Sequence, residues 1–184
     1  MKKSILFVLF TFLSVTVFSQ VTWNAKAGMN LSNYTGDNDM NAKVGFKIGG
    51  GLEYGFTDLW SLQPSLFVST KGAKYDDATL NAVYLELPVM AAARINVADN
   101  TNIVISAGPY FAYGIGGKTS IGDHSVDTFG DDGLNRFDAG LGLGVAAEFG
   151  KVVVGLDGQL GLAEVQKLGN PKNINFSITL GYKF

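Results

Sequence analysis

The feature that most constrains this chain is an alternation of apolar residues with small or polar ones, which recurs in eight segments. In Ile174–Phe184 every second residue is apolar, and the residues between are asparagine, serine, threonine, glycine and lysine. A period of two indicates a strand with two unlike faces. Each segment is long enough to cross a bilayer at a tilt of about 45°. We therefore expect eight strands: Thr22–Leu31, Lys43–Phe56, Ser61–Lys71, Val83–Ile95, Asn102–Ile115, Arg136–Phe149, Val152–Leu162 and Ile174–Phe184.

The connections between these segments alternate in length. The longer ones are Ser32–Ala42, Gly72–Ala82, Gly116–Asn135 and Ala163–Lys172, and the shorter ones are Thr57–Trp60, Asn96–Thr101 and Gly150–Lys151. A membrane barrel with an even number of strands has short periplasmic turns on one side and longer loops on the other. The sequence thus predicts an all-β fold, an eight-stranded antiparallel up-and-down transmembrane β-barrel. The first and the last strand should have their chain termini on the side of the short turns.

The composition agrees with this prediction. Charged residues make up 16% of the chain, against about 25% in soluble domains. Glycine accounts for 24 of the 184 residues, and mean hydropathy is positive. Beyond residue 19 there is no run of eighteen uncharged apolar residues that would indicate a membrane-spanning helix. The chain is therefore more apolar than a typical soluble domain. Because it has no candidate membrane-spanning helix beyond residue 19, we expect strands to cross the membrane.

The polar face of the strands decides which way the barrel faces. A soluble eight-stranded barrel buries its apolar face, whereas a membrane barrel turns that face outward and must be closed. Along Asp138–Glu148 the polar face reads Asp, Gly, Gly, Gly, Ala, Glu. Serial glycine weakens a strand, but in a narrow barrel it makes room for longer neighbours. We expect glycines and charges inside, and two aromatic girdles outside: Trp23, Tyr54, Phe56, Trp60, Phe149, Tyr182 and Phe184 near the short turns, and Tyr34, Phe46, Phe111, Tyr113 and Phe137 near the long loops.

Three prolines fall inside the predicted strands, at Pro64, Pro88 and Pro109. Each removes one backbone donor, and a closed barrel has no edge at which to place it. Bulges would absorb them. The strand register near these prolines is left open by the sequence.

Ten charged residues have the parity of the polar face, five of each sign, and we expect them to form a charge network in the lumen: Lys26, Lys47, Glu53, Lys71, Glu86, Arg94, Asp138, Glu148, Asp157 and Lys183. Strand direction places Lys26, Glu53, Arg94, Glu148 and Lys183 near the short turns, and Lys47, Lys71, Glu86 and Asp138 near the long loops. Buried charges need partners. The network is either an ion path or gate, or a salt-bridged core that plugs the barrel. An eight-stranded interior is just wide enough for side chains, which favours the plug.

The beginning of the chain resembles a secretory signal peptide. Lys2 and Lys3 precede an apolar stretch from Ile5 to Phe18, and the small residues Val17 and Ser19 fit a cleavage site. We predict a signal peptide over residues 1–19 and one barrel domain over residues 20–184. The chain has no cysteine for a lipid anchor or a disulfide bond. Its net charge of −2 and the lack of a basic run argue against a nucleic-acid partner.

The longest predicted loop, Gly116–Asn135, holds the residues that could form a catalytic or metal site. His124 and Ser125 lie next to each other there, with acidic residues nearby. Adjacent residues on an extended chain point in opposite directions, so we expect a solvated loop histidine and no catalytic triad. The same loop holds four aspartates whose spacing does not match a calcium-binding loop: Asp123, Asp127, Asp131 and Asp132. We therefore predict no metal and no cofactor.

Three short stretches resemble the outer-membrane β-barrel domain family, often called porin-family or PorT-like proteins. They are AKAGMNLSN (Ala25–Asn33), YLELP (Tyr84–Pro88) and LGYKF (Leu180–Phe184). The resemblance implies an OmpA- or OmpX-like barrel in the outer membrane of a Gram-negative bacterium. It also implies that Leu180, Tyr182 and Phe184 form the signal recognised by the barrel-assembly machinery. The family transfers no catalytic residues, and its porin label does not establish conduction.

Together these observations predict a non-enzymatic, monomeric barrel with a filled lumen, embedded in outer-membrane lipid. It would act in envelope structure or in surface interaction through its long loops, which offer a place for an extracellular ligand. Loops carry function on a rigid scaffold, and Gly116–Asn135 is the longest one here. Two alternatives stay open: a narrow channel for ions or small solutes, and a lipid-modifying enzyme of the outer membrane.

Overall fold

The computed structural model describes residues 21–35, 41–75, 78–122, 124–129, 133–165 and 171–184. The predicted signal peptide lies outside the described residues and stays a prediction. Within the described ranges no helix is both long and apolar enough to cross a membrane.

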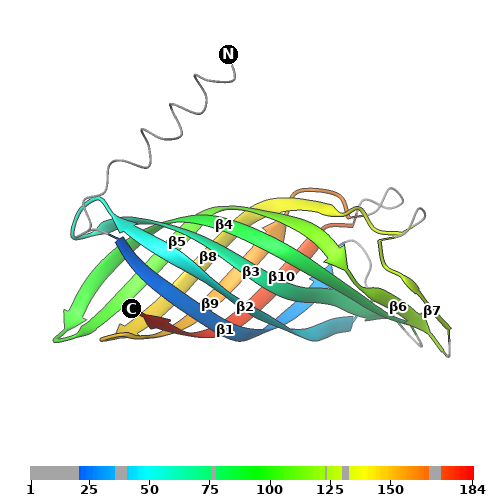
Figure 1. The fold of residues 1–184 in the computed structure, drawn as a ribbon, viewed down its shortest axis with the longest axis horizontal. Coiled ribbons are helices and arrows are strands. Elements are labelled where there is room, and N and C mark those ends of the chain that lie inside the picture. Colours follow the sequence, from blue (N-terminus) through cyan, green and yellow to red (C-terminus); the bar gives the residue numbers. More distant parts are fainter. Residues whose placement is uncertain (1–20, 36–40, 76–77, 123, 130–132, 166–170) are drawn as a thin grey trace, which may run out of the picture.

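The described chain forms one antiparallel sheet that closes on itself (Figure 1). Its neighbour order is β3-β2-β1-β10-β9-β8-β5-β4, and pairing of β3 with β4 completes the circle. A short hairpin, β6 and β7, continues the sheet from β4. The predicted eight-stranded up-and-down barrel is therefore confirmed. The strands are β1 (Val21–Tyr34), β2 (Asn41–Gly55), β3 (Trp60–Tyr75), β4 (Ala78–Ala98), β5 (Thr101–Gly116), β6 (Lys118–Ile121), β7 (His124–Asp127), β8 (Phe137–Phe149), β9 (Val152–Gly161) and β10 (Asn173–Lys183).

The short turns all lie at one end of the barrel, where β1 begins and β10 ends (Figure 1). They comprise residues 56–59, 99–100 and 150–151. Asn100 and Gly150 adopt positive φ angles of 56° and 59° in the two tightest turns. Glycine and asparagine are the residues that tolerate this conformation best.

Two predicted loops are wrong because strands continue into them. The predicted connection Gly72–Ala82 is mostly strand, since β3 and β4 stay paired out to Tyr75 and Ala78. The predicted loop Gly116–Asn135 contains the β6–β7 hairpin, which turns at Gly122 with a φ of 55°. Both extensions project beyond the barrel wall at the long-loop end (Figure 1). Lipid does not surround them there, so the apolar alternation that identifies the other strands is not required of them.

The three prolines leave the strand register unchanged. The β5–β8 ladder runs through Pro109 without interruption. At Pro64 and at Pro88 two residue pairs are missing, and the pairing then resumes in the same register. A missing N–H removes a hydrogen bond but inserts no residue, so no bulge is needed. The register shifts lie elsewhere, at Ala42–Lys47, Val83–Tyr84 and Asn96–Ala98.

The two faces of the wall have the predicted orientation, except at Tyr34, which was expected in the outer girdle but is 5% exposed and packs inside against Val165. Leu143, Leu156 and Phe176 point outward and are 68%, 62% and 60% exposed. Asn30 and Ser177, on the alternate parity, point inward and are 2% and 6% exposed. An apolar surface that runs around the whole barrel would be unstable in water, whereas lipid covers it without leaving backbone groups unpaired. The interior is polar and the exterior is apolar, as in outer-membrane barrels.

Candidate functional site: the lumen and its two ends

Four charged side chains from four strands close the lumen at the short-turn end. In this lower quartet, Arg94 Nε donates to Glu148 Oε2 at 2.9 Å, and Arg94 Nη2 donates to Glu53 Oε1 at 2.5 Å. Lys183 Nζ bonds Glu53 Oε2 at 2.7 Å and also bonds Glu148. Each carboxylate thus bridges both cations, and the signs alternate around the ring. Bidentate, charge-assisted bonds of this kind are the strong ones.

An open vestibule lies at the same end. This cavity of about 510 Å³ is lined by Thr22, Glu53, Gly55, Phe56, Thr57, Asp58 and Arg94. The Arg94 side chain is 28% exposed, whereas that of Glu53 is 4% exposed. The vestibule therefore ends at the lower quartet.

A second charged cluster lies in the half of the lumen near the long loops. In this upper cluster, Lys71 Nζ lies 2.6 Å from Glu86 Oε1 and 3.8 Å from Asp138 Oδ2. Tyr110 Oη donates to Asp138 Oδ2 at 3.2 Å, and Asn173 Nδ2 donates to the same oxygen at 2.8 Å. The three charged side chains are fully buried. The Lys71 ammonium also lies 4.8 Å from the centre of the Tyr110 ring.

Between the two clusters the lumen keeps a cavity of about 50 Å³. Lys26, Lys47, Asp157 and Gln159 are among its polar lining residues. Thr179 Oγ1 donates to Asp157 Oδ2 at 3.5 Å, and the Lys47 ammonium lies 4.6 Å from the centre of the Phe67 ring. This space has room for water, and it is about a tenth of the volume of the vestibule.

An apolar cap lies over the upper cluster. Phe129, from the segment after β7, packs edge-on against Tyr84 with ring centres 5.5 Å apart. Arg136 Nη1 donates to the Gly114 carbonyl at 2.8 Å, and its guanidinium lies 5.3 Å from the Phe129 ring centre. A Cβ atom at Gly114 would lie 2.3 Å from the Phe129 ring, so glycine is required there. The loops thus fold back into the barrel mouth.

A second apolar residue completes this cap. Val165, from the segment after β9, is fully buried against Tyr34 and Ala73. A hydrogen bond of 2.8 Å from the Asn135 N–H to the Val165 carbonyl joins the two loop segments. Phe129 and Val165 were not predicted, because neither belongs to an alternating segment. Phe129 lies between Thr128 and Gly130, and Val165 lies between Glu164 and Gln166, so neither has a local signal.

All ten predicted lumen residues belong to strands of the barrel, and the structure divides them into three groups. Glu53, Arg94, Glu148 and Lys183 form the lower quartet, and Lys71, Glu86 and Asp138 form the upper cluster. The other three, Lys26, Lys47 and Asp157, line the middle cavity, although strand direction had placed Lys26 and Lys47 at opposite ends. The uncharged partners Tyr110, Gln159 and Asn173 were missed. Their inward parity was the available signal.

The predicted assembly residues lie on the outer face of β10. Leu180, Tyr182 and Phe184 are 61%, 46% and 71% exposed, and the rings of Tyr182 and Phe184 meet edge-on at 5.5 Å. Their recognition by the assembly machinery stays a prediction.

The candidate catalytic residues lie apart from the lumen on the projecting hairpin. His124 and Ser125 are both exposed on β7, and Ser125 Oγ shares a 2.9 Å hydrogen bond with Ser120 Oγ. Asp123, Asp131 and Asp132 lie outside the described residues. In the part of the chain that is described, no three histidine or acidic side chains gather as metal ligands would.

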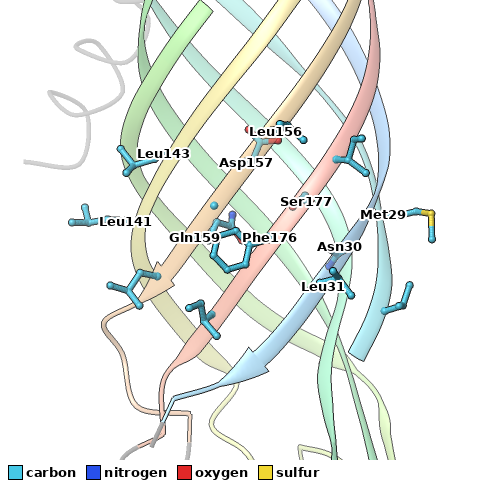
Figure 2. Close-up of a pocket in the computed structure, with 15 residues that line it drawn as sticks. Met29, Asn30, Leu31, Leu141, Leu143, Leu156, Asp157, Gln159, Phe176 and Ser177 are labelled. Carbon is cyan, nitrogen blue, oxygen red and sulfur yellow. The ribbon is translucent and has the colours of Figure 1, made fainter. Parts of the chain in front are cut away.

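The membrane-facing surface is hollowed over β8, β9, β10, β1 and β2. Figure 2 shows this apolar groove, of about 1030 Å³, with Leu141 and Leu143 on one side and Met29 on the other. The Phe176 ring crosses its centre and lies over Gly158, its partner on β9. The groove is open to the exterior, and most of its lining residues are apolar. It belongs to the surface that acyl chains cover.

Comparison with known proteins agrees with this architecture. Neisserial surface protein A is 11% identical, with a TM-score of 0.61, and the match covers 89% of this chain and 97% of that one. The outer membrane enzyme PagL is 12% identical, with a TM-score of 0.56 and coverage of 86% and 98%. The outer membrane protein OprG of Pseudomonas aeruginosa is 12% identical, with a TM-score of 0.51 and coverage of 90% and 96%. At these identities the likeness shows the fold alone.

The sequence itself gives the family. No curated protein matches it, but the family described as outer membrane protein beta-barrel domain matches residues 16–167. That range includes β1 to β9. The chain belongs to the outer membrane protein β-barrel domain family and is an integral protein of the outer membrane.

Proposed function

We propose that this outer-membrane protein is a non-enzymatic, monomeric barrel whose lumen is sealed by its own side chains. It serves the envelope structurally and contacts the outside through its loops. The observation that carries the proposal is that the lumen is obstructed at three levels, by the lower quartet, the upper cluster and the apolar cap. A buried ion pair costs several kcal/mol to separate, so ions do not pass by simple diffusion.

Conductance measurements test the sealed lumen. We expect the purified protein in planar bilayers to show no steady single-channel current. Glu53→Ala removes one acid of the lower quartet but leaves the upper cluster and the cap in place, so it should also stay silent. A steady wild-type current that Glu53→Ala or Arg94→Ala either abolishes or increases would overturn the proposal.

A narrow channel is the second candidate, because the lumen has open space both at the short-turn end, in the vestibule, and in the middle cavity. In this candidate the lower quartet is the gate. Each cation bonds two acids, so it can release one acid while it stays bonded to the other. This candidate predicts a small conductance that rises when the quartet is weakened. The same recordings therefore separate the two functions.

The surface role is supported by the β6–β7 hairpin, which projects from the barrel (Figure 1). Ile121 and Val126 on this hairpin are 58% and 61% exposed. Exposed apolar residues at the end of a rigid scaffold favour contact with a partner. Replacing Lys118–Asp127 with a short glycine–serine linker should reduce cell–cell aggregation or adhesion to coated surfaces. Equal adhesion with equal amounts of barrel in the membrane would contradict this role.

The absence of enzymatic activity is supported by the surroundings of His124. Its neighbour Ser125 bonds another serine, and the hairpin that carries both residues stands away from the membrane-facing groove. Unchanged membrane lipids in His124→Ala cells and in cells lacking the protein are the expected result. A lipid change that follows loss of His124 would establish the enzyme alternative.

A further inference from the structure

The middle level of the lumen carries one more cation than acid, and the upper cluster next to it carries one more acid than cation. Lys26 and Lys47 face Asp157 there, and two cations against one acid give a local charge of +1. Among the described residues, every ion pair of the lumen belongs to the lower quartet or to the upper cluster. Within the part of the chain that the structure describes, neither lysine ammonium has an ion pair or a hydrogen bond of its own.

Lys47 is the more isolated of the two cations. It is only 4% exposed, and its ammonium contacts the face of Phe67. Glu86 attracts it at longer range, but that carboxylate is already bonded by Lys71 at 2.6 Å and by Gln159 at 3.5 Å. A buried charge without a partner is costly.

Lys26 adds to this unbalanced charge. In the β1–β2 ladder Lys26 pairs with Gly49 and Lys47 pairs with Gly28, so the two lysines are diagonal neighbours. Diagonal side chains on adjacent strands lie about 7–8 Å apart, and like charges at such positions repel each other. Asp157, on the inner side of β9 next to the outward Leu156 (Figure 2), attracts Lys26 but forms no ion pair with it.

The cavity between these groups fits a small ion. Its volume of about 50 Å³ exceeds the roughly 10–15 Å³ that a site needs to hold one water. A halide ion with accompanying water has room here, whereas a nucleotide, a sugar phosphate or a peptide does not fit. Gly142, which lines this level of the wall, leaves room on the inner side, where a Cβ atom would lie 3.4 Å from the Met90 side chain.

We propose that the middle cavity is a binding site for a monatomic anion, with chloride as the physiological occupant. Lys47 and Lys26 hold the ion by charge from two adjacent strands, and Gln159 lies at the same cavity to orient the accompanying water. The anion neutralises the surplus charge and relieves the repulsion between the lysines. This site is independent of whether the lumen conducts.

The test uses the full barrel refolded into detergent or vesicles in sodium chloride, bromide or gluconate at equal ionic strength. Refolding in each salt lets the ion enter before the lumen closes. We expect a higher unfolding temperature in chloride and bromide than in gluconate, which is too large for the cavity. Lys47→Met keeps an apolar chain over Phe67 but removes the charge, and should weaken halide binding at least tenfold. Lys74→Met, at an exposed position of β3, is the matched control and should keep the wild-type response.

Crystals grown in bromide provide a readout that does not depend on a variant. An anomalous peak between Lys26 and Lys47 is expected. Halide and gluconate giving the same unfolding temperature, or a Lys47→Met protein that responds to halide as the wild type does, would overturn the site. So would a cavity that holds only water in bromide. If Lys47→Met fails to fold, the anomalous peak in the wild-type crystal decides the question.

Discussion

The Lys71 ammonium is fully buried between the carboxylates of Glu86 and Asp138, beside the Tyr110 ring. A lysine in such a place is stabilised only by its partners, because desolvation alone opposes the charge. The partners come from β4 and β8, so this single residue connects three strands across the lumen. Its contribution to stability should therefore be large and specific.

Lys71→Ala should lower the free energy of unfolding by about 3–5 kcal/mol, because it leaves two acids buried near each other without a cation. Urea unfolding of the reconstituted barrel, followed by tryptophan fluorescence, measures the change. Lys74→Ala removes an exposed lysine three residues away and should cost about 0.5 kcal/mol or less. The double variant Lys71→Met with Glu86→Gln should recover part of the loss. Equal unfolding curves for Lys71→Ala and Lys74→Ala would show that the buried pair contributes nothing.

At the scale of elements, the loop after β7 docks on the barrel through one ring and one glycine. Phe129 occupies the space that a side chain at Gly114 would need. Gly114→Ala should therefore displace the ring and destabilise the barrel by about 1–3 kcal/mol, as overpacking does. The displaced loop should also become more sensitive to added protease.

Gly116 provides the control on the same strand, because a Cβ atom there meets nothing within 4 Å. Gly116→Ala should leave both stability and protease sensitivity close to those of the wild type. The double variant Gly114→Ala with Phe129→Ala no longer has the steric clash, so it should lose less stability than Gly114→Ala alone. Its loop should regain only part of the wild-type resistance to protease. If Gly114→Ala and Gly116→Ala behave alike, the cap does not depend on this contact.

The strands were predictable from sequence because lipid imposes a rule on them. Every second residue of β8 and β10 must be apolar where it meets acyl chains, and that period appears directly in the sequence. Beyond the membrane the rule does not apply, so the outer parts of β3 and β4 and the β6–β7 hairpin were assigned to loops. The positions of Phe129 and Val165 depend on tertiary contacts and had no local signal.

The lumen was predictable in its composition but not in its pairing. Parity alone shows that Arg94 and Glu53 face inward. It does not show that they meet, because the tilt and stagger of the strands set which levels coincide. The same stagger brings Lys26 and Lys47 to one cavity, although their positions along the strands suggested opposite ends.

At the scale of the whole molecule, the barrel reverses the usual distribution of apolar and polar residues in a soluble protein. Its continuous apolar surface faces outward, and its charged groups face inward, where those of the lower quartet and the upper cluster pair with one another. This arrangement removes every open edge from the membrane-crossing strands.

Cysteine substitutions on one strand test this inversion directly, because the chain contains no cysteine of its own. On β10, Ile178 and Leu180 are 54% and 61% exposed, whereas Ser177 and Thr179 are 6% and 5% exposed. Each of the four is replaced singly by cysteine, and the folded protein in vesicles is treated with a lipid-soluble spin label. We expect strict alternation along the strand. Labels at positions 178 and 180 should relax with oxygen dissolved in the bilayer, whereas the thiols at positions 177 and 179 should react only after unfolding. Water-soluble reagents reaching 178 and 180, or labels at 177 and 179 that contact lipid, would contradict it.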